Sequence, residues 1–174
     1  MSRLLTALFA ALLIPTAHAA LAVGAPAPDF TAEAAVGGQA FKFNLAEALK
    51  KGPVVLYFYP KAFTSGCTVE AHQFAEATDK FKALNTTVIG MSNDNIDTLK
   101  KFSVEACRNK FAVAADAAGK VIKDYDVALK MAPGFADRVS YLIGTDGKVA
   151  AVHASMDPDG HIDAMLKAAE KLKK

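Results

Sequence analysis

The sequence predicts an α/β domain in which helices flank a mixed central β-sheet and a β-hairpin precedes the sheet. Residues 54–59 are apolar throughout, which is typical of a central strand that helices cover on both faces. Residues 139–145 and 148–154 are two further apolar segments joined at Asp146 and Gly147, a strong hairpin signal. Parallel and antiparallel pairing are therefore both expected in one sheet.

The N-terminal part of this domain is expected to form a hairpin and a short helix. Residues 30–35 and 39–43 flank Gly37 and Gly38, as in a β-hairpin. Asn44 is a suitable N-cap for a short helix that ends near Gly52. The strand 54–59 follows and ends at Pro60.

The rest of the chain alternates helices and strands. The apolar spacing predicts helices over about 67–84 and over a segment that contains Ile96 and Ala106. Residues 86–91 form the strand between them, and residues 116–119 a turn before a short helix that ends at Tyr125. A last helix is expected over about 158–171. The order hairpin, β, α, β, α, short α, β, β, α is that of a thioredoxin-like fold.

Residues 1–19 have the pattern of a secretory signal peptide. Arg3 precedes an apolar run over 4–14, and Ala17-His18-Ala19 is an A-x-A cleavage pattern. The apolar run is too short to span a bilayer stably, and no cysteine marks a lipid anchor, so no stable membrane anchor is expected. We therefore expect residues 20–174 to form one domain that works in a bacterial periplasm.

The charge balance and the cysteine count limit the possible functions. The net charge is +2 and no basic stripe stands out, so nucleic acid is not expected as a partner. The chain has two cysteines, Cys67 and Cys107. An oxidising compartment permits a disulfide between them, either as a structural link or as a reactive pair.

The segment 60–70 places Cys67 where the central strand passes into a helix. Free backbone N–H groups and the positive end of the helix dipole favour a thiolate at such a position. Gly66 lets the backbone approach a bound molecule, and Thr64 offers a hydroxyl to the same pocket. Pro60 shapes the pocket without adding a competing donor. These residues predict a nucleophilic thiolate with a small oxygen-binding pocket.

Selective attack on a hydroperoxide needs fixed donors for both peroxide oxygens. A guanidinium supplies such donors together with a charge that is not lost. Apart from Arg3, the chain has two arginines, Arg108 and Arg138. Arg138 is the better candidate because it directly precedes the strand expected beside the central one. Glu70, one turn into the helix, could pair with Arg138 and orient it.

The pattern PxxxTxxC, read as Pro60, Thr64 and Cys67, together with Arg138 resembles the peroxiredoxins. The residues around Tyr57–Lys61 and Gly66–Glu70 look most like the bacterioferritin comigratory protein, or PrxQ, branch. The resemblance implies Cys67 as the peroxidatic cysteine, Thr64 and Arg138 as activating residues and Pro60 as pocket wall. It also implies antioxidant reduction of hydrogen peroxide and organic hydroperoxides, a thioredoxin-like or glutaredoxin-like reductant, a monomer, and no metal or organic cofactor.

One position departs from the pattern of that branch. Many members have a resolving cysteine five residues after the peroxidatic one, where this chain has His72. Others have it on the helix after the next strand, where Cys107 is expected. We therefore expect a sulfenic acid on Cys67 to condense with Cys107. The alternative is that Cys107 is a buried, inert residue.

Two other functions fit the sequence less well. A periplasmic thiol–disulfide oxidoreductase would need Cys-x-x-Cys, but position 70 is Glu. A thioredoxin-like copper chaperone would need a close thiol pair, but position 71 is Ala. His153 and His161 show no metal-ligand spacing and are expected to have no function. Phe63 and Phe135 are expected as loop aromatics near the pocket.

Overall fold

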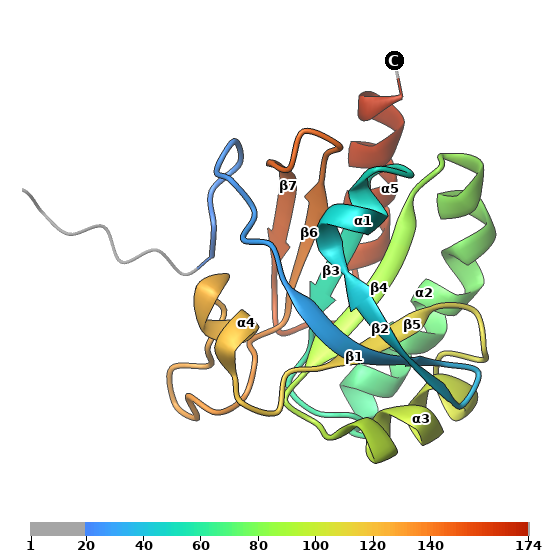
Figure 1. Ribbon diagram of the computed structural model, residues 1–174, viewed down its shortest axis with the longest axis vertical. Helices are drawn as coiled ribbons and strands as arrows, with labels where there is room; N and C mark the ends of the chain where they lie inside the picture. Colours follow the sequence, from blue (N-terminus) through green and yellow to red (C-terminus); the bar gives the residue numbers. More distant parts are fainter. Residues whose placement is uncertain (1–19, 174) are drawn as a thin grey trace, which may run out of the picture.

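The computed structural model describes residues 20–173, which form a seven-stranded mixed sheet flanked by helices (Figure 1). The strand order is β2-β1-β5-β4-β3-β6-β7. The strands are β1 (Thr31–Val36), β2 (Gln39–Asn44), β3 (Val54–Phe58), β4 (Thr87–Ser92), β5 (Ala112–Ala115), β6 (Val139–Ile143) and β7 (Val149–Ala154). The helices are α1 (Leu45–Leu49), α2 (Ser65–Ala83), α3 (Ile96–Glu105), α4 (Lys120–Asp124) and α5 (His161–Leu172). This arrangement confirms the predicted fold class.

The strand predicted to be central, β3, lies inside the sheet. It pairs in parallel with β4 and antiparallel with β6, so the sheet is mixed as expected. Every residue of β3 is buried. Its alternate side chains enter two separate apolar cores, which explains why the segment has no polar face.

Each face of the sheet carries its own core. Leu56 and Phe58 point to the core under α1 and α4. Tyr57 and Tyr59 point to the opposite core, which α2, α3 and α5 cover. The helices α2 and α5 also contact each other on that face. The residue at the start of α5 is therefore brought close to the first turns of α2.

The N-terminal hairpin agrees with the prediction. The strands β1 and β2 pair antiparallel from Thr31 opposite Asn44 to Val36 opposite Gln39. The Asn44 side chain accepts a hydrogen bond from the Glu47 N–H at 2.8 Å, which caps α1. The signal peptide predicted over residues 1–19 lies outside the described residues. Among residues 20–173, no helix is long and apolar enough to cross a membrane.

One strand and three helix boundaries differ from the prediction. The strand β5 was not predicted, because four Ala and Val residues carry little periodicity. The helix α2 begins at Ser65, so Cys67 is its third residue rather than its first. The helix α3 ends at Glu105 with Ala106 as its C-cap, so Cys107 lies in the turn after the helix rather than on it. The final helix begins at His161, after a bend at residues 156–158.

Candidate active site

The loop between β3 and α2 fixes the position of Cys67. Pro60 follows the strand, and the next turn is held by the Ala62 N–H, which donates to the buried Asp94 carboxylate at 2.8 Å. Thr64 has an extended backbone and stands at the N-cap of α2. Cys67 therefore lies in the first turn of a 19-residue helix, where backbone N–H groups have no partner inside the helix. Its side chain is 1% exposed.

Arg138 reaches Cys67 from the neighbouring strand. It directly precedes β6, whose first residue, Val139, pairs with Phe58 at the end of β3. The Arg138 Nη2 group donates to Cys67 Sγ at 3.5 Å, and Nη1 donates to Glu70 Oε2. The third nitrogen, Nε, donates to the Met156 carbonyl at 3.0 Å. All three nitrogens are engaged, so the guanidinium is held in one orientation toward the sulfur.

Gly66 makes room for this guanidinium. A Cβ atom at position 66 would lie 3.1 Å from Arg138 Nη2, closer than ordinary van der Waals contact. The backbone of Gly66 is helical, so the residue is required for space and not for an unusual φ. Position 66 is thus constrained by Arg138, whereas the predicted approach of its backbone to a bound molecule stays a prediction.

Burial and charge oppose each other in the ion pair. Burial raises the pKa of Glu70 to about 7, although Arg138 acts in the opposite direction. Burial opposes the charge of Arg138, but Glu70 and Cys67 together raise its pKa above the ordinary value. Glu70 is fully buried and Arg138 is 4% exposed. A buried pair of this kind is sensitive to the removal of either partner.

His161, which the sequence left without a role, belongs to the same cluster. The residue is fully buried at the start of α5, with Nδ1 2.8 Å from Ser140 Oγ and 3.7 Å from Glu70 Oε1. Its ring also meets that of His153, with ring centroids 4.5 Å apart. The signal that could have found it is the thioredoxin-like topology, which brings the start of the last helix toward the first turns of α2. Spacing along the chain carries no such information.

Thr64 and Pro60 flank the thiol less closely than Arg138 does. The Thr64 side chain is exposed, and its hydroxyl donates to the Lys61 carbonyl at 2.9 Å. Pro60 is half-buried. Of the two predicted loop aromatics, Phe63 packs edge-on against Phe102, and Phe135 lies under Lys61 Nζ at 5.6 Å from the ring centroid. The structure thus joins Arg138, Glu70 and Gly66 directly at Cys67, with Thr64 one turn away.

Cys107 is buried in the same core as Cys67, and both thiols are free. Burial raises the pKa of the Cys107 thiol strongly, so this sulfur is held as a thiol. The hydroxyls of Tyr57 and Tyr59 lie in the same core, and burial is the largest cause of the raised pKa of each. Within residues 20–173, the hydroxyls of Tyr57 and Tyr59 have no hydrogen-bond partner of ordinary geometry. The Ser92 side chain lies near the Tyr59 hydroxyl.

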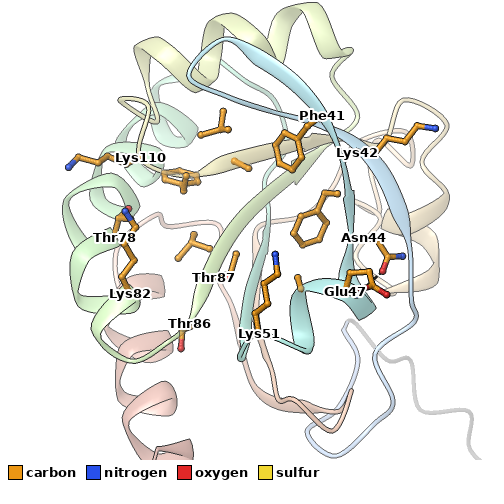
Figure 2. A pocket seen from close by; sticks show the side chains of 16 residues that line it. Phe41, Lys42, Asn44, Glu47, Lys51, Thr78, Lys82, Thr86, Thr87 and Lys110 are labelled. Atoms are coloured by element: carbon orange, nitrogen blue, oxygen red, sulfur yellow. Dashed lines mark hydrogen bonds between the residues drawn. The ribbon is translucent and has the colours of Figure 1, made fainter.

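A separate hollow lies beside β2, α1 and the C-terminal half of α2 (Figure 2). Its volume is about 480 Å³, and its lining combines phenylalanines with lysines, among them Phe41, Phe43, Lys51 and Lys82. None of its lining residues belongs to the thiol site. In the described part of the chain, no group of three or more His, Cys, Asp or Glu side chains is arranged to hold a metal ion.

The sequence is similar to a family of known proteins. Residues 23–152 match the model described as the AhpC/TSA family. The chain is 34% identical over 125 residues to the chloroplastic peroxiredoxin Q of Sedum lineare, covering 71% of this chain and 67% of that protein. It is 34% identical over 131 residues to the chloroplastic peroxiredoxin Q of Suaeda salsa, covering 74% and 61%.

Solved structures give the same assignment. The crystal structure of the peroxidoxin BcpB from Mycobacterium tuberculosis superposes with a TM-score of 0.79 at 29% identity, over 90% of this chain and all of that one. The chain therefore belongs to the AhpC/TSA family and is a peroxiredoxin, a thiol-dependent peroxidase. Within the peroxiredoxins it falls in the PrxQ, or bacterioferritin comigratory protein, branch.

Proposed function

We propose that Cys67 reduces hydrogen peroxide and organic hydroperoxides, with Arg138 as the group that activates it. The observation that carries this assignment is the contact of Arg138 Nη2 with Cys67 Sγ at 3.5 Å in a buried, helix-start position. In the first step the thiolate attacks one oxygen of ROOH and the O–O bond breaks. Cys67 becomes a sulfenic acid, and the departing alkoxide takes up a proton to become ROH.

The surrounding residues fit the needs of this step. The guanidinium and the free N–H groups at the start of α2 supply fixed donors for the peroxide oxygens. Gly66 leaves the space in which Arg138 sits, and Glu70 orients it. We assign Thr64 to substrate binding, which requires its hydroxyl to turn from the Lys61 carbonyl toward the bound peroxide. Pro60 forms a wall of the pocket.

The test of this assignment is peroxide consumption by the purified protein with a dithiol reductant. The Cys67→Ser variant should lose turnover to background, because no other thiol occupies a helix start. Arg138→Lys should lower the second-order rate constant by about 10²-fold or more, since a single ammonium cannot hold Glu70, Met156 and the sulfur together. Turnover that survives Cys67→Ser would refute the assignment.

For the second step we propose that Cys107 resolves the sulfenic acid. The Cys107 thiol attacks the Cys67 sulfenic acid, an S–S bond forms and water leaves. Cys107 is fully buried, and we propose that the turn after α3 and the first turn of α2 open to bring the two sulfurs together. Non-reducing peptide mapping after one equivalent of peroxide should show a Cys67–Cys107 disulfide. A lasting Cys67 sulfenic acid beside a free Cys107 would contradict this step.

The cellular setting completes the proposal. The pattern of Arg3, the apolar run over 4–14 and Ala17-His18-Ala19 supports export to a periplasm with cleavage near residue 19. A thioredoxin-like or glutaredoxin-like protein would then reduce the disulfide, and the protein would act as a monomer. N-terminal sequencing of the protein from fractionated cells tests export, and sedimentation of its reduced form tests the monomer. Retention of residues 1–19 in the cytoplasmic fraction would contradict export.

A further inference from the structure

The hollow beside β2, α1 and α2 lies between the N-terminal hairpin and the beginnings of β4 and β5 (Figure 2). The strand β1 pairs with β2 from Thr31 to Val36, but with β5 at Ala34 and Ala35. The hairpin therefore diverges from β5 beyond this contact and leaves a cavity of about 480 Å³. Sites for small organic ligands have volumes of about 300–1,000 Å³, so this cavity is large enough for one.

The floor of the hollow is apolar. Phe43, Val88 and Phe111 line it and are buried, and Phe41 is 40% exposed beside them. Phe43 belongs to the core under α1, whereas Val88 and Phe111 belong to the core under α2 and α3. Both cores are thus reached from this one opening, and a hydrocarbon chain bound there would be removed from water.

The polar side chains in the floor already have partners. The hydroxyl of Thr78 donates to the carbonyl four residues earlier at 2.9 Å. The hydroxyl of Thr86 donates to the carbonyl two residues earlier at 3.2 Å. Within residues 20–173, the buried side-chain atoms that lack a hydrogen-bond partner do not include any that line this hollow. The floor therefore has no polar group that a ligand would need to satisfy.

The charges around the floor are mainly positive. Glu47 is the one carboxylate residue in the described lining, and Lys50 Nζ binds it at 2.5 Å. None of the lysines in the lining forms a salt bridge within residues 20–173. These lysines are Lys42, Lys51, Lys82 and Lys110. An apolar floor with unpaired cations around it is complementary to a molecule with an apolar body and a negative charge.

Lys51 is the lysine best placed to meet such a charge. Figure 2 shows its side chain reaching over the middle of the hollow and that of Lys82 lying along the α2 wall, whereas the other two lysines point outward at the edges. The Asn85 side chain donates to the Lys51 carbonyl at 2.7 Å. A Cβ atom at Gly52 would lie 2.0 Å from the Asn85 carbonyl oxygen. The loop that carries Lys51 is therefore packed tightly against the turn after α2.

We propose that this hollow is a second ligand site, which binds an organic anion with an apolar chain, of the fatty-acid type. The chain lies on Phe41, Phe43 and Phe111, and its burial supplies most of the affinity. The carboxylate binds Lys51, and Lys82 adds positive charge at the α2 wall. The charged groups select an anion over a neutral molecule with the same chain.

The charge pattern favours this ligand over a second copy of the chain. A symmetric dimer through the hollow would bring the lysines of one copy against those of the other. Like charges that face each other across an interface oppose association. A small anion neutralises the same lysines.

NMR titration of the isotope-labelled, reduced protein with octanoate, 1-octanol and acetate tests the ligand class. Octanoate should shift the backbone signals of residues that line the hollow, such as Val36 and Phe111, and the shifts should saturate. The neutral octanol should bind about fivefold more weakly, and acetate should cause no saturable shift. Equal affinity for octanoate and octanol, or no saturable shift with octanoate, would overturn the proposal.

Two pairs of substitutions test the place of binding. Lys51→Gln should weaken octanoate binding about fivefold and leave octanol binding unchanged, whereas Lys123→Gln on α4 should change neither. Phe41→Ala should weaken the binding of both molecules about fivefold or more. Phe63→Ala removes an exposed aromatic side chain beside the thiol loop and should bind octanoate as the wild type does. Loss of binding in Phe63→Ala but not in Phe41→Ala would place the ligand at the thiol site and refute the second site.

Sedimentation of the wild type and Phe41→Ala tests the other occupant. The wild type should sediment as a monomer with and without octanoate. A wild-type dimer that Phe41→Ala dissociates would show that a second copy covers the hollow, and would overturn the proposal.

The outcome is independent of the peroxidase assignment. Cys67→Ser should bind octanoate with the affinity of the wild type, because Cys67 does not line the hollow. Peroxide consumption without octanoate binding would refute only the second site. Octanoate binding without Cys67-dependent peroxide consumption would refute only the peroxidase assignment.

Discussion

At the scale of single residues, the decisive feature is the fit between Gly66 and Arg138. The Arg138 fork makes three hydrogen bonds, to Cys67, Glu70 and the Met156 carbonyl, so it has little freedom to move aside. The Cβ atom of any other residue at position 66 would lie 3.1 Å from Arg138 Nη2, which is too close for ordinary contact. Site geometry here depends on the absence of a side chain as much as on the presence of one.

We expect Gly66→Ala to lower the second-order rate constant with hydrogen peroxide by about 10- to 100-fold, because even small displacements of a positioned group are costly. The fold should not suffer, since Ala is a better helix former than Gly by about 0.5–1 kcal/mol. Stopped-flow kinetics and thermal unfolding of the same samples separate the two effects. If the rate constant of the variant were unchanged, Arg138 could move aside without a loss of activity.

The sequence was informative for residues whose chemistry is local and weaker for those that meet across the fold. Cys67 and Gly66 could be placed because a strand, a proline and a helix start are visible in one short segment. The Glu70–Arg138 contact followed from the expected strand order. His161 was not found, because only the packing of α5 against α2 brings it to Glu70. The turn of the Thr64 hydroxyl toward Lys61 is a side-chain torsion that sequence does not specify.

At the scale of elements, the two cysteines lie in segments that can open. Cys67 is in the first turn of α2, and Cys107 follows the C-cap of α3. The turn after α3 contains Arg108 and Asn109 in the left-handed region, at φ 51° and 60°. Residues other than glycine adopt that region rarely. Two of them in succession make a turn whose backbone conformation is not favoured by the local sequence. Such a segment is suited to local opening.

We expect hydrogen exchange to become faster in these two segments, 64–70 and 103–111, once Cys67 is oxidised to the disulfide. The reason is that these two segments carry the buried sulfurs, and we propose that both segments open when the disulfide forms. Mass-spectrometric exchange on the reduced and oxidised wild-type protein provides the measurement. Cys107→Ser treated with one equivalent of peroxide is the control and should keep its α3 turn protected. Protection that is unchanged on oxidation of the wild type would argue against Cys107 as the resolving residue.

At this scale the sequence also shows where prediction failed. The strand β5 consists of four small residues, and its place in the sheet comes from pairing with β4 on one side and β1 on the other. Such a strand has no alternation of apolar and polar residues, so only its pairing with β4 and β1 defines it as a strand. The strands with bulky apolar residues, β3 and β6, were predictable because burial on both faces dictates their composition.

At the scale of the whole molecule, the site joins parts of the chain that are distant in sequence. Cys67 and Glu70 come from α2, Arg138 from the start of β6, and His161 from the start of α5. The Met156 carbonyl adds the segment after β7. The protonation state of the cluster is therefore coupled to the unfolding of the domain as a whole.

Glu70 and His161 should have opposite effects on the pH dependence of unfolding. Burial raises the pKa of Glu70 from 4.5 to about 7, so its stabilising contribution is complete below pH 4.5 and is lost as the pH rises through 7. Burial lowers the pKa of His161 from 6.5 to about 4, so its contribution is complete above pH 6.5 and is lost as the pH falls through 4. Between pH 4.5 and 6.5 the two slopes oppose each other in the wild type.

Glu70→Gln removes one of these slopes while it keeps the shape of the side chain. The free energy of unfolding of the variant relative to wild type should therefore rise between pH 4.5 and 7. Its slope should reach about 1.4 kcal/mol per pH unit where the folded and unfolded states differ by a whole proton. Urea unfolding of both reduced proteins across this range, with equal m-values, gives the difference directly. A difference that is constant with pH would mean that Glu70 titrates alike in the folded and unfolded chains, and that burial does not control its proton.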